Sequence, residues 1–143
     1  MKTSARNQFP GAITAVEFGP VTTQVEITLA GGQEITATLT TNAARRLDAS
    51  VGKSALVLIK SSAVVLVTDF EGYALSARNQ LPGTISRVDR GAVSSLIGLT
   101  LAGGALVTAS VTNDAVDALG LQVGQAATAV FKAYAVMLAV KSA

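Results

Sequence analysis

The sequence predicts an all-β protein built as two tandem five-stranded barrels, each with a short helix between its third and fourth strands. Three observations lead to this fold class. The 143-residue chain carries the same pattern twice, apolar and polar residues alternate in several runs of each copy, and the period lengthens at one place in each copy. Half of the residues are hydrophobic and 14% are charged, which leaves ample apolar side chain for a packed core.

The repeat is most evident at the start of each copy. Residues 4–11 read Ser-Ala-Arg-Asn-Gln-Phe-Pro-Gly and return at residues 76–83 with Leu in place of Phe. With the same offset, residues 4–68 align without a gap to residues 76–140, and 28 of the 65 positions are identical.

This repeat predicts two domains of similar size. The first covers residues 1–70 and the second covers residues 71–143. Residues 68–75 connect the two repeats and are too few for a flexible tether.

The first three strands of each copy follow from β-prone runs and turns. In the first copy, residues 11–18 form a β-prone run that ends at Gly19-Pro20, and apolar residues alternate with polar ones over 24–29 and again over 34–39. Ala30-Gly31-Gly32 between the last two runs predicts a tight hairpin turn.

The period then changes. Residues 42–47 predict a short helix with Thr40, Thr41 or Asn42 as its N-cap, and residues 113–119 predict its counterpart, which Gly120 ends. Two nearly all-apolar runs follow, residues 54–59 and 63–67, which we expect to be strands buried on both faces.

This order of elements is that of a small OB-like barrel. A barrel of about 65 residues buries little surface by itself, so we expect burial against a twin domain or another chain, and hence an oligomer.

Several function classes are excluded by composition. The chain has no Cys, His or Trp, which rules out disulfides, thiolate or imidazole metal sites and Ser–His or Cys nucleophiles, so we expect no enzyme, no catalytic cofactor and no direct metal-cation ligands. A net charge of +2 without a basic stripe predicts no nucleic-acid partner. The chain has no apolar stretch of spanning length and no apolar core near Met1 typical of a secretory signal, so we expect no membrane partner and a cytoplasmic location.

The polar residues that both copies share indicate the chemistry. Most charges do not repeat, but Arg6 repeats as Arg78 and Lys60 repeats as Lys132. Two hydroxyl residues repeat as well, Ser4 as Ser76 and Thr40 as Thr112. This set consists mainly of hydrogen-bond donors, which suits a fully deprotonated oxyanion that only accepts hydrogen bonds. Such a site would hold an anion without transforming it.

Each of these residues also has a plain structural interpretation. The strand-end lysines can be solvated gatekeepers against edge pairing, and Thr40 and Thr112 can be simple helix N-caps. The segments 19–23 and 91–95 can be ordinary hairpin connections, although their amides and hydroxyls could also face an anion.

Four features together resemble the molbindins, which are built from Mop domains. They are the opening motif in each half, Ala-Gly-Gly in the second hairpin, Val-Thr before the second short helix, and Lys at the end of the fourth strand. The resemblance covers residues 4–140. The arrangement of two such domains in tandem is similar to the di-Mop members of that family. It implies an OB-like fold, reversible binding of molybdate and tungstate, a cytoplasmic location and a homotrimer with anions at domain interfaces.

The resemblance also implies site residues. In the main site, the opening motif and the strand-end Lys come from one domain, and the Thr before the helix and an amide near it come from a neighbouring domain. These positions are Ser4, Ala5 (backbone), Arg6, Lys60, Thr40 and Ala43, and in the second copy Ser76, Ala77 (backbone), Arg78, Lys132, Thr112 and Ala115. A second site on a threefold axis would use Pro20, Val21, Thr22 and Thr23, and Ala92, Val93, Ser94 and Ser95.

The chain departs from the family pattern in three places. Ala43 and Ala115 stand where some members have Ser, so only backbone can donate there. Pro-Trp often follows the strand-end Lys, and this chain has Ser61-Ser62 and Ala133-Tyr134 instead. The turn after the first strand often carries Asn, whereas this chain carries Thr and Ser.

The leading hypothesis is therefore an oxyanion-binding protein for molybdate storage or homeostasis. The alternative is a free-standing molybdate-sensing module that acts on a separate regulatory partner, since we find no helix-turn-helix or Walker A loop in the sequence. An OB-fold nucleic-acid binder is a third option, against which stands the lack of clustered aromatic residues.

Overall fold

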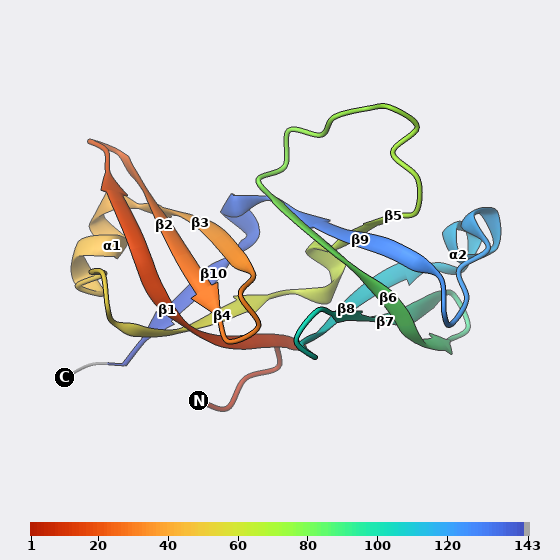
Figure 1. The fold of residues 1–143 in the computed structure, drawn as a ribbon. Coiled ribbons are helices and arrows are strands. Elements are labelled where there is room, and N and C mark those ends of the chain that lie inside the picture. The colour runs from red at the N-terminus through yellow and green to blue at the C-terminus, as the bar shows by residue number, and fades with distance from the viewer. Residues whose placement is uncertain (142–143) are drawn as a thin grey trace.

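The computed structural model describes residues 1–141, and the order of elements is the same in both halves of the chain (Figure 1). Each half has the expected three strands, short helix, fourth strand and fifth strand, and a 3-10 turn that was not expected lies between the last two strands. The first half contains β1 (Asn7–Phe18), β2 (Thr22–Leu29), β3 (Glu34–Thr40), α1 (Thr41–Arg46), β4 (Ser54–Ile59), the 3-10 helix η1 (Ser61–Ala63) and β5 (Val65–Val67). The second contains β6 (Asn79–Arg90), β7 (Ser94–Leu101), β8 (Leu106–Thr112), α2 (Asn113–Leu119), β9 (Ala126–Phe131), η2 (Ala133–Ala135) and β10 (Met137–Val140).

The two halves exchange their fifth strands. One curled sheet has the strand order β10-β4-β1-β2-β3 and the other has the order β5-β9-β6-β7-β8. The last strand of the chain thus pairs antiparallel with β4, Met137 opposite Leu58, and β5 pairs with β9, Val65 opposite Val130. In Figure 1, β10 crosses into the half that holds β1–β4. Residues 1–70 and 71–143 therefore divide the sequence into its repeats, while each sheet draws on both.

The exchanged strands differ from the sequence expectation. Residues 63–67 were expected to form a strand buried on both faces, and this is wrong. The strand begins only at Val65, after a 3-10 turn, and Val65 is 59% exposed. The strand lies at the edge of its sheet, so among the described residues it has a paired strand on one side only, and its Val65 side chain is open to solvent. Met137, its counterpart in β10, is half exposed for the same reason.

The short helices begin and end as their caps dictate. Thr40 is the N-cap of α1, and its Oγ1 accepts a hydrogen bond of 3.1 Å from the amide of Ala43. Thr112 caps α2 in the same way, with 3.2 Å to the amide of Ala115. Gly120 ends α2 in a left-handed conformation, with φ of 60°, which glycine adopts without a Cβ clash. The predicted capping roles are confirmed.

One continuous apolar core joins the two sheets. Buried strand residues such as Ile13, Ile27 and Val57 belong to the same cluster as Ile85, Leu99 and Phe131 of the other half. The hairpin tips at Gly31 and Gly103 also meet, and the Gln33 side-chain amide donates to the carbonyl of Ala102. Because the core and the hairpins both cross the boundary, the two halves are packed as one unit. Within residues 1–141, no helix is long and apolar enough to cross a membrane.

Candidate anion-binding site

Antiparallel pairing brings Arg6 and Lys60 together although they are 54 positions apart in the sequence. Strand β1 starts at Asn7, which lies opposite Ile59 at the end of β4. The residue before β1 and the residue after β4 are therefore neighbours, and these are Arg6 and Lys60. In the second half, Asn79 lies opposite Phe131, so the same register places Arg78 beside Lys132. The fold thus brings the backbones of an arginine and a lysine to the same corner of each half.

A buried asparagine fixes the direction of each opening segment. The Asn7 side chain donates from Nδ2 to the carbonyl of Thr108 at 2.8 Å, and its Oδ1 accepts from the Thr108 amide at 2.7 Å. Asn79 makes the matching pair with Thr36, at 2.9 and 2.8 Å. Each asparagine side chain accepts from one backbone amide and donates to the carbonyl of the same residue, as a paired strand would. It thereby links its half to the third strand of the other half. Arg6 and Arg78, one residue earlier, are therefore held at the boundary between halves.

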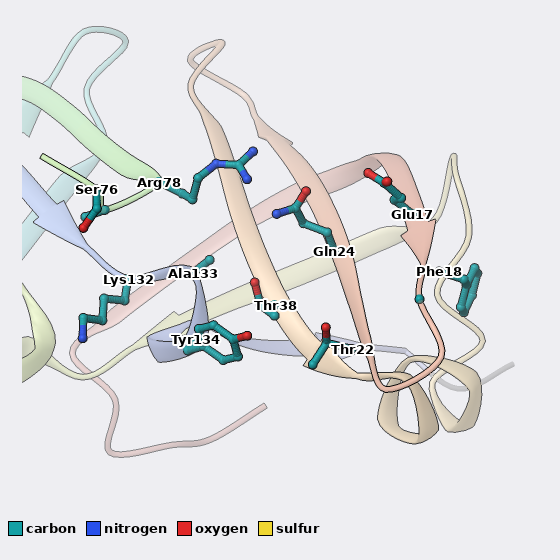
Figure 2. A pocket seen from close by; sticks show the side chains of 12 residues that line it. Glu17, Phe18, Thr22, Gln24, Thr38, Ser76, Arg78, Lys132, Ala133 and Tyr134 are labelled. Atoms are coloured by element: carbon teal, nitrogen blue, oxygen red, sulfur yellow. The ribbon is translucent and has the colours of Figure 1, made fainter. Parts of the chain in front are cut away.

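The second-copy residues line a cavity of about 560 Å³ between the halves. Ser76, Ala77, Arg78 and Lys132 come from one half, and residues of β1, β2 and β3 come from the other. Figure 2 shows Arg78 extended toward Gln24 of β2, while the Lys132 side chain points in the opposite direction. The remaining lining residues are Glu17, Phe18, Gly19, Thr22, Gln24, Thr38, Ala133 and Tyr134.

The first-copy residues line a smaller cavity of about 220 Å³. It brings together Ser4, Ala5, Arg6 and Lys60 with Thr3, Ser61, Ser62 and Met137. Arg6 also lines an adjoining cavity of about 120 Å³, whose walls include Arg87, Asp89 and Thr108 of the other half. Arg87 and Asp89 form an ion pair of 2.6 Å there. The four predicted residues of each opening-motif cluster are thus brought together in both copies.

The helix-start residues lie elsewhere in the single chain. Thr40 and Ala43 do not line the cavity around Arg78, and Thr112 and Ala115 do not line either cavity around Arg6. The Ala43 and Ala115 amides already donate to their capping threonines, whereas the threonine O–H groups donate to no other group among the described residues. From the strand before α1, it is Thr38 that reaches the cavity around Arg78.

The turn residues of the predicted axial site point in different directions. Thr23 and Ser95 are buried, and their hydroxyls bond to Thr41 at 2.8 Å and Asn113 at 2.6 Å. Val21 and Val93, at the tips, are 73% and 78% exposed. Pro20, Thr22, Ala92 and Ser94 are exposed as well, and Thr22 lines the cavity around Arg78.

Sequence reasoning missed the residues that line these cavities from the opposite half. Gln24 and Tyr134 have no like counterpart, since Leu96 and Ser62 occupy the aligned positions, so repetition could not single them out. Thr38 aligns with Ser110, and this shared hydroxyl was the one available signal.

The charge of these cavities comes from arginine and lysine and not from a bound cation site. Within the part of the chain that the structure describes, no group of three or more Asp, Glu, Cys or His side chains could hold a metal ion. The pKa of Asp117 is lowered, and that of Arg90 raised, by the hydrogen bonds between them, but this exposed pair links β6 to α2. The arrangement can therefore hold an anion by charge-assisted hydrogen bonds.

Comparison with known proteins agrees with this architecture. The TOBE domain model matches residues 3–66 and again residues 75–138. A solved structure of a cytoplasmic molybdate-binding protein, ModG, with molybdate bound, superposes with a TM-score of 0.96 at 44% identity, covering 99% of this chain and 100% of that one.

Two curated relatives are longer than this chain. It is 71% identical over 141 residues to the molybdenum transport protein ModE of Herbaspirillum seropedicae and 37% identical over 139 residues to the molybdenum-pterin-binding protein MopA of Rhodobacter capsulatus. These matches cover 99% and 97% of this chain but 52% of each relative, so the chain spans about half the length of these proteins. With both repeats matched, the chain belongs to the TOBE domain family and carries two TOBE domains in tandem.

Proposed function

We propose that this protein binds molybdate, and the isosteric tungstate, reversibly and without chemistry, for molybdenum storage or homeostasis. The observation that carries the proposal is the duplicated cluster of Ser, Arg and Lys at the boundary between halves. The near-identical backbone of a protein crystallised with molybdate supports it.

The donor set matches the chemistry of the anion. A tetrahedral dianion such as molybdate has only acceptor oxygens at neutral pH, and hydroxyl, guanidinium, ammonium and backbone N–H groups all donate. Ser4, Arg6 and Lys60 would supply these donors in one site and Ser76, Arg78 and Lys132 in the other. We propose no catalysis, because the chain contains neither a His nor a Cys to pair with a nucleophile.

We propose that a second copy of the chain completes each main site. Thr40 with the Ala43 backbone, and Thr112 with the Ala115 backbone, lie away from the clusters of their own chain and would close the clusters of a neighbour. The exposed apolar tips at Val21 and Val93 favour such contacts between copies. The proposed assembly is a homotrimer in the cytoplasm, with the axial site formed by Pro20, Val21, Thr22 and Thr23 and by Ala92, Val93, Ser94 and Ser95.

Native mass spectrometry with added molybdate tests the proposal. Binding at interfaces stabilises only the associated form, so we expect trimers that carry several molybdates and a melting temperature that rises with molybdate concentration. In the double variant Lys60→Ala and Lys132→Ala, the loss of one charge-assisted hydrogen bond per site should weaken binding at least about tenfold in calorimetry.

Lys141→Ala is the matched control, because Lys141 is an exposed lysine outside both clusters. Its molybdate affinity should equal that of the wild type. Unchanged affinity in the double variant would identify Lys60 and Lys132 as solvated strand-end residues.

A second candidate function is molybdate sensing for a regulatory partner. The 71% identity to ModE favours it, as does the similarity to a protein described as the DNA-binding transcriptional dual regulator ModE of Escherichia coli, which is 38% identical. We propose no nucleic-acid contact by these two domains themselves. A pull-down from cell extract with and without molybdate separates the two functions, since only a sensor retains a partner in a molybdate-dependent way.

A further inference from the structure

The sheet surface beneath Arg6 differs in charge from the one beneath Arg78. In the sheet that holds β6–β8, pairing places Arg87, Gly98 and Thr108 in one row across three strands. In the sheet that holds β1–β3, the matching row is Ala15, Glu26 and Thr36. The first row thus carries a cation, Arg87 on β6, whereas the second row carries an anion, Glu26 on β2.

The asparagine contacts place each arginine over one of these rows. Asn7 bonds to the backbone of Thr108, so Arg6 lies beside the row of Arg87, and the two arginines line the same cavity. Asn79 bonds to the backbone of Thr36, so Arg78 lies beside the row of Glu26. The two clusters are therefore held against different electrostatic surroundings by the same backbone device.

The difference extends beyond a single row. The cavity of Arg6 and Arg87 is also lined by Asp89, Gly98 and Leu106. The aligned positions in the other sheet carry acids at all three places: Glu17, Glu26 and Glu34. Asp89 is paired with Arg87 at 2.6 Å, whereas Glu17 lines the cavity of Arg78 and has no ion-pair partner within 4.0 Å among the described residues.

Gly98 gives the Arg87 side chain its room. A Cβ at Gly98 would lie 3.1 Å from the Cβ of Arg87 and 3.3 Å from Cδ1 of Leu106. Any larger residue there would crowd the arginine, while Glu26 in the other sheet stands beside the small Ala15. The second sheet thus carries an arginine beside a glycine where the first sheet carries an alanine beside a glutamate.

From this contrast we infer that the two main anion sites of one chain have unequal affinity, and that Arg87 and Glu26 set the order. The inference rests on the proposed function. The site of Ser4, Arg6 and Lys60 is the tighter one, since Arg87 neutralises Asp89 and leaves Arg6 without a competing carboxylate. At the site of Ser76, Arg78 and Lys132, Glu17 lines the cavity, and Glu26 and Glu34 add negative charge to the same sheet, so these acids repel a dianion. One unit charge about 8 Å from a dianion in water changes its affinity by about fivefold, so several charges exceed the scatter of a binding measurement.

Single-site variants separate the two affinities. Lys132→Ala disables the second-copy site and reports on Arg6, and Lys60→Ala does the reverse. In titrations with sodium molybdate at low salt, we expect the Lys132→Ala protein to bind its remaining anion about tenfold more tightly than the Lys60→Ala protein. The ratio should shrink in 0.5 M NaCl, because salt screens the surrounding charges.

Reciprocal exchange of the two residue pairs tests the cause. Ala15→Arg with Glu26→Gly, in the Lys60→Ala background, should raise molybdate affinity at least about threefold. Arg87→Ala with Gly98→Glu, in the Lys132→Ala background, should lower it by a similar factor. Glu26→Gln and Arg87→Gln alter charge with little change of shape, and they should act in the same directions if an exchanged pair unfolds the protein. Circular dichroism checks the fold of each variant.

The outcomes distinguish a failure of the unequal affinities from a failure of the proposed molybdate binding. Wild-type protein that fails to bind molybdate would reject the proposed function. Wild-type binding with equal affinities in the two single-site variants, or exchanges that leave both affinities unchanged, would overturn the inference alone.

Discussion

The two halves use different side-chain contacts between their first strand and their short helix. Where the first strand of each half approaches the short helix, the first half places the Arg45 guanidinium 5.9 Å from the centre of the Phe18 ring. The aligned positions in the second half are Asp117 and Arg90, which form a two-bonded ion pair at 2.8 and 3.0 Å. In the first half the cation, Arg45, lies on the helix and contacts a ring on the strand. In the second half the cation, Arg90, lies on the strand and contacts a carboxylate on the helix.

The asparagine contacts between halves show no such freedom. Asn7 and Asn79 make the same two hydrogen bonds, to the backbone of Thr108 and Thr36. A side chain that bonds to backbone faces a partner that no substitution changes, whereas a side chain that contacts another side chain can be replaced together with its partner. The comparison explains why the opening motif persists in both copies while charges around it have diverged.

Removing the asparagine contacts should have the largest effect. Asn7→Ala or Asn79→Ala leaves an amide and a carbonyl of the opposite strand without partners, and each unmet group costs on the order of 1–3 kcal/mol when buried, as at Thr36, or partly buried, as at Thr108. We expect each variant to lower the free energy of unfolding by about 2–4 kcal/mol in urea titrations, by similar amounts for the two.

Gln8→Ala and Gln80→Ala are the controls, because both glutamines are exposed neighbours of the asparagines. They should change stability by less than about 0.5 kcal/mol. A large difference between the two asparagine variants would show that the two contacts are not equivalent.

The meeting of the hairpin tips predicts an intermediate effect. Gly103 has φ of 88°, and a Cβ there would lie 2.8 Å from Cα of Gly31. Gly104 has φ of 95° but no atom within 4 Å of such a Cβ. Gly104→Ala should therefore lose only about 1–2 kcal/mol from backbone strain, and Gly103→Ala about 1–3 kcal/mol more from displacement of the opposite tip. Equal losses in thermal unfolding would show that the tips separate freely.

The smallest expected effect distinguishes the two strand–helix contacts by pH. Hydrogen bonds from Arg90 lower the pKa of Asp117 below its ordinary 3.8, so the pair stabilises the folded state above that pH and loses its contribution as the pH falls through the lowered pKa. The stability difference between wild type and Asp117→Asn should thus be constant from pH 7 to pH 5 and vanish in strong acid. The difference for Arg45→Ala should not vary over this range, because the contact between Arg45 and the Phe18 ring involves no carboxylate. A pH-independent Asp117→Asn effect would contradict the pairing.

Much of this architecture could be predicted from the sequence, because it depends on local patterns. The hairpin at Gly31-Gly32, the caps at Thr40 and Thr112 and the end of α2 at Gly120 all rest on backbone preferences of single residues. The grouping of Arg6 with Lys60 was expected from family resemblance, and the strand register accounts for it.

The features that could not be predicted from the sequence depend on contacts between the repeats. A repeat alignment states which residues correspond but not which half supplies the neighbour of a strand, so the exchange of β5 and β10 left no trace in the sequence. Gln24 and Tyr134 line a site because the opposite half approaches them, and their own copies carry unlike residues. The predicted roles of Thr40 and Thr112 in anion binding stay predictions, since they concern a second copy of the chain.

The exchange of final strands has a consequence for synthesis. Residues of β1–β4 leave the ribosome about 80 residues before the strand that covers the free edge of β4, which is β10 at Met137–Val140. The sheet that starts earlier therefore keeps an open edge, which is prone to pairing with other chains, until β10 has been synthesised. A nascent chain that stalls after β9 could complete the sheet of β5–β9, because all five of its strands have been made. It could not complete the sheet of β1–β4, which lacks β10.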